Sequence, residues 1–375
     1  MVTHLTRQGQ KRYRIADMKA QAIADLYSDY LLASFGATTA TGLSELLEGE
    51  VSHDQVTRYL AGTKKTATDL WQTVKPLVRD IQAETGVLII DDSIEEKPYT
   101  DENDIICWHY DHSKDRMVKG INFLTGLYRS QGVNVPVGFH LVAKTEKYTD
   151  PKTQKEKRRS PVSKNDVCQD IIKQAVTNLI PFRFVLFDVW FASADTMVFI
   201  KQKQKRDFIC PLKTNRKVAL SLADKQRGRY VRVDKLELEA QATREIYLEG
   251  VPFPLVLVKQ VFTNADGSIG IRYLVSSDTT LSFHTLTTIY HERWEVECYH
   301  KSLKQNVSLA KSPTQTVTTQ TNHFFAALCG FVKLERLKMQ TKLNHFALKS
   351  KLYVNALRSA FATLQTLSPA LTGSA

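Results

Sequence analysis

The sequence predicts an α/β fold with helical regions at both ends of the chain. Two continuous apolar runs, GVLIIDD (86–92) and FRFVLFD (182–188), are short enough to be buried strands, and each ends in aspartate. The second run leads into ASADTMVFIKQKQ (192–204), whose apolar residues recur at helical spacing. Strands that are linked first through hairpins and later through helices are typical of this fold class.

Two short amphipathic helices are predicted in TGLSELLEGEVSHDQVTRYLAG (41–62), separated by a turn that contains glycine. This arrangement indicates a helix-turn-helix, and the alternative is a plain helical bundle. Ser52 is a suitable N-cap for the second helix. The side chains expected on the exposed face of that helix, where a DNA groove would receive them, are Gln55, Arg58 and Tyr59.

Strand and helix signals alternate in the middle of the chain. KGINFLTGLYRS (119–130) and VNVPVGFHLVAK (133–144) are predicted strands, joined by a Gln-Gly pair like a β-hairpin. Residues 145–164 are polar and crowded with Lys and Arg, which indicates a loop, and a helix is predicted at about 165–179. We expect this loop and the run KQKQKR (201–206) to add nonspecific phosphate contacts, and a merely solvated surface is the alternative.

From about residue 207 to residue 278 the pattern becomes β-rich, with five strand-like stretches separated by turn residues such as NADGS (264–268). We interpret this region as an inserted sheet. The chain returns to helix near Leu281, and it is predicted to stay helical and amphipathic from Thr318 to about Leu367.

The composition points to a folded, basic protein. The 375 residues should form two or three compact units, and 43% hydrophobic residues are ample for a sizeable core. Lys and Arg number 51 against 39 Asp and Glu, which gives a formal net charge of +12. Such a charge favours a polyanionic partner such as nucleic acid, and a merely basic soluble protein is the alternative.

Targeting signals and cysteines bear on the cellular compartment. The N-terminal stretch MVTHLTRQGQKRYRIADMK is basic but lacks the apolar core of a signal peptide, and no apolar run approaches the ~18 residues of a membrane span. We therefore expect a cytoplasmic protein that does not contact the membrane. The five cysteines are odd in number and never in CxxC spacing, so neither a disulfide framework nor a zinc site is predicted.

Carboxylates stand at the ends of the two apolar strands. Asp92, with Asp91 beside it, follows the first strand, and Asp188 follows the second. Ligand sites in open α/β sheets gather at the carboxyl ends of the strands. The alternative is that these aspartates only cap helices or form turns.

The stretch YHERWEVECYHKSLKQ (290–305) mixes charged and aromatic residues on one predicted helix. A helical period of about 100° per residue places four of its residues on one face, with two more at the sides. The face consists of Tyr290, Arg293, Glu297 and Lys304, flanked by Trp294 and Lys301. An exposed helix with ion pairs is the alternative, but aromatic groups among Arg and Lys suit stacking and phosphate contacts with nucleic acid.

Three acids and a polyanionic substrate imply a divalent metal. Attack on a phosphodiester is easier when two cations about 3.5–4 Å apart hold the attacking and the leaving oxygen. Mg²⁺ prefers oxygen ligands, so we predict two Mg²⁺ ions held by Asp92, Asp188 and Glu297, with Mn²⁺ able to substitute and no small-molecule cofactor. Arg293 and Lys304 would bind the flanking phosphates.

These residues match a known family. The sequence resembles a bacterial insertion-sequence transposase of the DDE class, in the cut-and-paste group marked by Y-x-x-R-x-x-x-E-x-x-x-x-x-x-K. Tyr290, Arg293, Glu297 and Lys304 reproduce that spacing without a gap. The blocks IIDDS, KGINFLTGLY and VLFDVWFAS resemble the strand-borne blocks of the group, and the similarity runs from about Gly86 to Leu337.

The resemblance implies a ribonuclease-H-like (retroviral-integrase-like) core with a β-rich insertion between the second Asp and the Glu. The predicted divisions are a helical, helix-turn-helix DNA-binding domain (1–80), the first part of the core (81–206), the β-rich insertion (207–279), the core completion with the Glu-bearing helix (280–337) and a C-terminal helical region (338–375) as a candidate for dimerisation.

The resemblance also implies the roles of single residues. In that group the first acid precedes Thr or Ser, so Asp92, which precedes Ser93, is the better match and Asp91 is the reserve. Asp188 matches the second acid and Glu297 the third. Tyr290, Arg293 and Lys304 would contact phosphates of the transposon end, and Trp294 would stack near an everted base. Related enzymes carry a second tryptophan on the inserted sheet, whereas this chain has Arg272 and Tyr273, so Tyr273 would have to stack in its place.

The reaction so implied starts with water attack at the transposon end, which exposes a 3′-hydroxyl. In several members of the group that hydroxyl makes a DNA hairpin, which a second water opens before the end joins target DNA. The implied partners are double-stranded DNA, as terminal inverted repeats and as target, and a second copy of the chain in a homodimer. A bacterial, nucleoid-associated protein is implied.

Three other interpretations remain. A domesticated transposase that has lost its chemistry would be a DNA-binding regulator. Tyr290 as a covalent nucleophile, as in tyrosine recombinases, would leave Asp92 and Asp188 without a role. His109 and His112 have H-x-x-H spacing, but without a clear metal partner we interpret them as turn or DNA-facing residues.

Overall fold

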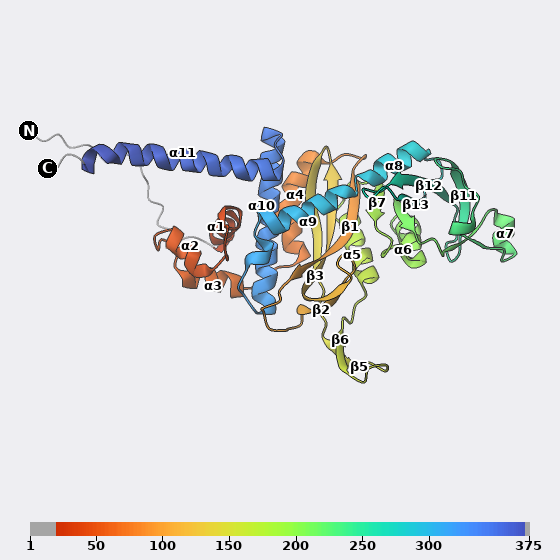
Figure 1. Cartoon of the computed structure of the whole chain (residues 1–375), viewed down its shortest axis with the longest axis horizontal. Helices are drawn as coiled ribbons and strands as arrows, with labels where there is room; N and C mark the ends of the chain where they lie inside the picture. Colours follow the sequence, from red (N-terminus) through yellow and green to blue (C-terminus); the bar gives the residue numbers. More distant parts are fainter. Residues whose placement is uncertain (1–19, 372–375) are drawn as a thin grey trace, which may run out of the picture.

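A computed structural model describes residues 20–371 of the chain. The molecule is elongated, with a large sheet and its helices at the centre and the long last helix projecting from the body (Figure 1). The first nineteen residues of the predicted DNA-binding domain lie outside the described residues. No helix among residues 20–371 combines the length and apolar character needed to cross a membrane.

Four helices precede the sheet, and the second and third of them lie where a helix-turn-helix is predicted. The four helices are α1 (Ala20–Ala33), α2 (Ala40–Leu46), α3 (His53–Ala61) and α4 (Ala67–Ile81). Ser52 caps α3 as predicted, in a capping box with Gln55. Arg58 is exposed, but Tyr59 is half-buried with its ring 5.9 Å from that of Tyr27, so Tyr59 does not share the exposed face.

One eleven-stranded, mostly antiparallel sheet forms the centre of the molecule. In its interior, β1 (Val87–Glu96) pairs antiparallel with β3 (Arg116–Ser130) and parallel with β7 (Phe184–Phe187). β7 also pairs parallel with β8 (Asp207–Leu212). The two apolar runs that end in aspartate are therefore neighbouring strands, and their carboxylates lie at the same end of the sheet.

The predicted hairpin is present. β3 and β4 (Val133–Leu141) are joined at Gln131 and Gly132, whose φ angles of 51° and 76° are those of a tight two-residue hairpin turn. β2 (Ile106–Asp111), which was not predicted, pairs with the start of β3 on the same edge as β4, opposite β1.

The β-rich region does not form a sheet of its own. β13 (Ile269–Ser276) pairs antiparallel with β8, so the inserted strands extend the central sheet, which corrects the expectation of a separate one. The other elements of this region are β9 (Lys217–Ala219), α7 (Leu222–Gln226), β10 (Val231–Arg232), β11 (Thr243–Leu248) and β12 (Leu255–Thr263).

The basic segment predicted as a loop contains a two-stranded antiparallel ribbon, β5 (Glu146–Thr149) and β6 (Glu156–Arg159). It protrudes from the body (Figure 1), and all eight strand residues are exposed. Cross-strand ion pairs replace the missing apolar contacts, with Lys147–Glu156 and Arg159–Glu146 both at 2.9 Å.

Helices cover both faces of the sheet. They are α5 (Lys164–Thr177), α6 (Ala194–Val198) with a π-helical turn (Phe199–Lys203), α8 (Phe283–His291), α9 (Trp294–Asn306), α10 (Val317–Thr341) and α11 (His345–Leu371). α5 packs closely on β3 because Gly126 has no side chain: a Cβ there would lie 2.5 Å from Ile171 Cγ2. α9 crosses β1 on the other face (Figure 1).

Buried polar contacts fasten the N-terminal helices to α10. The Tyr27 hydroxyl lies 3.0 Å from Nδ1 of His323, and the Asn322 amide donates to the Leu60 carbonyl at 2.9 Å. These contacts lie inside one hydrophobic core that runs from α1 through the sheet to α10. The N-terminal helices therefore share the core of the sheet.

Candidate active site

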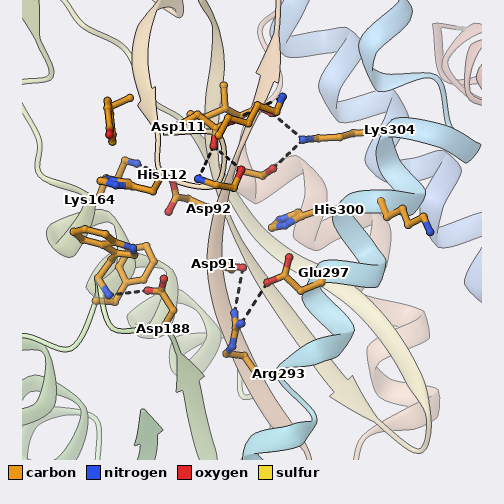
Figure 2. A pocket seen from close by; sticks show the side chains of 18 of the residues that line it. Asp91, Asp92, Asp111, His112, Lys164, Asp188, Arg293, Glu297, His300 and Lys304 are labelled. Atoms are coloured by element: carbon orange, nitrogen blue, oxygen red, sulfur yellow. Dashed lines mark hydrogen bonds and ion pairs between the residues drawn. The ribbon is translucent and has the colours of Figure 1, made fainter. Parts of the chain in front are cut away.

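A cleft of about 800 Å³ opens where β1 and β7 end, beside α9 and the start of α5. Its lining mixes acidic and basic side chains, many of which point toward one another (Figure 2). The acids are Asp91, Asp92, Asp111, Asp188 and Glu297, and the bases are Lys114, Lys164, Arg293, Lys301 and Lys304. All three predicted acids thus line one cavity.

Asp91 and Asp92 point to opposite faces of the sheet, because side chains alternate along a strand. Asp91 is 7% exposed and faces α9, where Arg293 Nη1 lies 3.4 Å from its Oδ2. Asp92 faces α5: its Oδ2 accepts from Lys164 Nζ at 2.6 Å and from the Asn122 amide at 2.9 Å. Neighbours in sequence therefore have different surroundings.

Asp91, Glu297 and His300 form a compact group of ligand atoms that all lie within 4.8 Å of one another. Glu297 and His300 are three residues apart on α9, which brings both side chains to the face turned toward β1. Two carboxylate oxygens and an imidazole nitrogen are donors that divalent metals accept. The donor set therefore fits a divalent cation, and it includes Asp91, the reserve choice for the first acid, and not Asp92.

Asp188 lies beside Asp91 at the end of the neighbouring strand. Ile90 is the parallel partner of Phe187, so the next residues of the two strands are Asp91 and Asp188. Burial raises the pKa of Asp188, and the backbone N–H of Trp190, which donates to its carboxylate at 2.9 Å, opposes that rise. Asp188 is outside the compact ligand group, on another wall of the same cleft.

The charges in the cleft are strongly coupled. Burial raises the pKa of Asp91 well above its usual value, Arg293 opposes this, and Asp188, Glu297 and Asp92 add to it. Burial lowers the pKa of His300 to about 3, so its ring is neutral at physiological pH. Burial and the neighbouring carboxylates thus disfavour the charged form of Asp91, and a bound cation would favour it.

Two predicted phosphate ligands line the cleft. Arg293 bridges Asp91 and Glu297, with 3.3 Å between its Nη2 and Glu297 Oε1. Lys304 Nζ donates to Ser93 Oγ at 3.1 Å and to the Ile94 carbonyl at 2.8 Å. Both hydrogen-bond partners of Lys304 are neutral, and its charge opposes the rise that burial causes in the pKa of the Glu95 carboxyl.

The helix predicted from Tyr290 onward is two helices, α8 and α9, with a short turn at Glu292 and Arg293. The backbone keeps helical angles through the turn, with φ −58° and ψ −28° at Arg293, so the predicted face largely survives. Tyr290 is an exception: it is 5% exposed, with its hydroxyl 3.5 Å from the Phe187 carbonyl. It does not reach the cleft.

The other predicted DNA contacts differ in exposure. Trp294 is 61% exposed on α9, and Lys301 lines the cleft. Tyr273 is only 5% exposed on β13, because its ring packs into the core, so it presents no stacking face. Arg58 lies on α3 beside a different cavity.

The two histidines of the H-x-x-H motif do not come together at a metal site. His109 is buried in β2, not in a turn, with its Nε2 3.3 Å from Cys107 Sγ. His112 stacks on Trp190 at 4.2 Å between ring centroids. Trp190 lines the cleft beside Asp188 and is half-exposed.

Sequence reasoning missed Lys164, Asn122, Trp190 and His300. A usable signal existed only for His300, which stands at i+3 from Glu297 on the same helix and so had to share its face. Lys164 and Trp190 line the cleft, and Asn122 contacts Asp92 from outside the lining, through tertiary contacts that no local spacing encodes.

Comparisons with known proteins identify the family of this chain. The family described as DDE superfamily endonuclease matches residues 10–240, more than half of the chain, and the family described as transposase DDE domain matches residues 162–331. No curated protein matches. Among solved structures, the Drosophila P element transposase strand transfer complex is similar at 14% identity, over 46% of this chain and 34% of that chain, with a TM-score of 0.24. This chain thus spans about a third of the length of that one. The chain belongs to the DDE superfamily of endonucleases, as a DDE-class transposase.

Proposed function

We propose that this transposase binds the inverted-repeat ends of a DNA element, cleaves them by metal-dependent hydrolysis and joins the resulting 3′-hydroxyl ends to target DNA. The cleft carries the proposal, because it gathers carboxylates from β1, β7 and α9 around a space lined by lysine and arginine. Clustered acids suit a cation, and the surrounding bases suit a phosphodiester.

We also propose that the central strands are a ribonuclease-H-like core. The pairing of β1 with the parallel strand β7 on one side and the antiparallel strand β3 on the other supports this assignment. So does the position of the inserted strands, which lie between Asp188 and Glu297 in the sequence.

The residues that would hold the two metal ions are Asp91, Asp188 and Glu297, and Asp91 and Glu297 would share one of these ions. Asp91 is favoured over Asp92 because its carboxylate joins Glu297 in the compact ligand group, whereas Asp92 is neutralised by Lys164. Mg²⁺ is the proposed ion, with Mn²⁺ as a substitute. When bound, such ions stabilise the negative charge that develops on the attacking and leaving oxygens.

The side chains of the cleft would orient the DNA. Arg293 and Lys304 would bind phosphates on either side of the scissile bond, Arg293 by its planar fork and Lys304 as a point charge. In cleavage, water oxygen bonds to phosphorus as the P–O3′ bond breaks, and the 3′-oxygen leaves protonated. In joining, that 3′-hydroxyl attacks a target phosphodiester and displaces another 3′-oxygen.

A DNA-hairpin route needs a stacking surface for a displaced base. Trp294 offers one, because most of its ring is exposed on α9. Tyr273 does not, since it is buried, so the proposed route depends on Trp294 alone among the predicted stacking residues.

The experiment uses a duplex that carries the inverted repeats flanking the gene, with Mg²⁺ or Mn²⁺. Nicking should fall by at least about 10²–10³-fold in each of Asp91→Asn, Asp188→Asn and Glu297→Gln, while end binding is kept. Each variant loses a carboxylate that would hold the metal, and the metal stabilises the charge of the transition state. Asp92→Asn is the matched control and should lose much less nicking activity.

Three results would change the assignment. Full loss of nicking in Asp92→Asn, with nicking kept in Asp91→Asn, would restore Asp92 as the first ligand. End binding by the unmodified chain without nicking in either metal would instead identify a catalytically silent, domesticated regulator. A trapped 3′-phosphotyrosyl adduct would point to Tyr290 chemistry, which its burial disfavours.

A further inference from the structure

His300 is a buried polar side chain that packing alone does not explain. It is 6% exposed, its ring meets Phe123 edge-on at 5.5 Å between centroids, and its Nε2 has no hydrogen-bond partner within the described residues. Buried ring nitrogens nearly always find a partner, because water can no longer satisfy them. An unpartnered one beside carboxylates therefore suggests a ligand.

The position of His300 fits a shared cation. Figure 2 shows His300 projecting from α9 into the cleft, near Glu297 and opposite Asp91. The ligand atoms of the three residues lie within 4.8 Å of one another. Metal–ligand bonds of roughly 2.0–2.2 Å place two donors on one ion up to about 4.4 Å apart, so small side-chain shifts would suffice.

Arg293 does not saturate the carboxylates of Asp91 and Glu297. It contacts Asp91 and Glu297 at 3.4 and 3.3 Å, at the long end of hydrogen-bond distances, and it makes no recorded contact with His300 among the described residues. Each carboxylate therefore keeps free lone pairs for a cation.

We propose that His300 is a nitrogen ligand of the metal that Asp91 and Glu297 bind, so that this site has two carboxylates and one imidazole. The inference rests on the proposed function, since it assigns a further ligand to the same metal. Imidazole suits Mn²⁺, Fe²⁺ and Co²⁺, whereas Mg²⁺ strongly prefers oxygen. His300 would thus set the metal preference of the site toward Mn²⁺.

The test is Mn²⁺ binding to the full chain without DNA, followed by pulsed electron paramagnetic resonance. The wild-type protein should show nitrogen modulation from a directly bound imidazole, which should change on ¹⁵N-histidine labelling. His300→Gln should lose that modulation and bind Mn²⁺ at least about tenfold more weakly, the scale on which ligand-shell changes act. Its Mg²⁺ affinity should change less than about twofold, because Mg²⁺ gains little from the imidazole.

His112→Gln is the matched control, because His112 lines the same cleft but stacks on Trp190 at its surface. It should keep the nitrogen signal. The labelled wild-type protein decides the question even if His300→Gln folds poorly.

Two outcomes overturn the inference and separate it from the proposed function. Mn²⁺ binding that depends on Glu297 but gives no nitrogen modulation would exclude His300 as a ligand and leave the carboxylate site intact. Absence of both Mn²⁺ binding and nicking would reject the metal site itself, together with the proposed function.

Discussion

Asp91 is the residue whose burial has the clearest consequence for stability. Burial raises its pKa in the folded chain, so the folded state holds this proton more tightly than the unfolded state. The contribution to stability is therefore full below the unfolded pKa and is lost as the pH rises through the folded pKa. Asp188, whose pKa burial also raises, acts in the same direction.

Asp91→Asn should therefore stabilise the metal-free protein near neutral pH. The gain should be on the order of 1 kcal/mol, or about 2–4 °C in Tm, and it should vanish at acidic pH, where the wild-type carboxyl is protonated. Thermal unfolding in chelator across this pH range measures it. Asp92→Asn, whose carboxylate is less buried than that of Asp91 and pairs with Lys164, should show no such gain. An equal response of both variants would contradict the assigned burial.

The sequence alone does not decide between Asp91 and Asp92 as the first acid. IIDD lies within β1, which continues to Glu96, and the apolar part of this strand is buried on both faces. Its pattern therefore does not show which residues point to which side. The order of the three acids and their meeting in one cleft were predictable from strand ends and helix spacing. The preference for Asp91 came only from the positions of α5 and α9 on opposite faces of β1.

Among the elements, close contact between β1 and β3 should be sensitive to a single methyl group. A Cβ at Gly120 would lie 2.2 Å from the Glu95 carbonyl oxygen, which is backbone and cannot rotate away. Gly120→Ala should cost about 1–3 kcal/mol in the free energy of unfolding, the usual cost of overpacking. Chemical denaturation measures it. Gly36→Ala, with nothing within 4 Å of its Cβ, should be nearly neutral.

The basic ribbon β5–β6 should contribute to DNA binding through its tip. Lys147, Lys157 and Arg159 are paired with acids inside the ribbon, whereas Lys152 and Lys155 have no ion pair among the described residues. Lys152→Ala with Lys155→Ala should lower the slope of log affinity against log salt by about 2, one unit per lost phosphate contact. Titrations at several salt concentrations measure the slope. Lys147→Ala should change it less, and unchanged slopes throughout would leave the ribbon as solvated surface.

Elements with a clear apolar pattern were predicted well, and polar ones were not. The capping box of α3, the hairpin between β3 and β4, and α5 follow from local sequence. β5 and β6 were taken for a loop because ion pairs, not apolar alternation, hold them together. The burial of Tyr290 and Tyr273, and the continuation of the sheet through β13, depend on contacts between segments far apart in sequence.

At the scale of the whole molecule, α11 projects from the body and carries apolar residues that nothing in the described chain covers (Figure 1). Its base is anchored, since the Tyr353 hydroxyl donates to the Ala33 carbonyl at 2.7 Å. Farther out, Val354, Leu357 and Phe361 are 49%, 56% and 61% exposed and recur at i, i+3 and i+7. A one-sided apolar stripe of this kind is typical of a helix that packs against a partner.

We predict that this stripe packs against a second copy of the chain. The proposed joining of two DNA ends requires two active sites, and a twofold contact is the commonest way to join identical chains. Leu357→Asp with Phe361→Asp should turn a dimer into a folded monomer, since two charges would be buried without partners. Light scattering after size-exclusion chromatography measures the mass, and Ser359→Asp, on the opposite side of α11, is the control. The monomer should still bind a single end, because both substitutions lie in α11 and not in α2 or α3, the proposed DNA-binding pair. It should lose cleavage that depends on paired ends. A wild-type chain that stays monomeric with paired DNA ends present would contradict this role of α11.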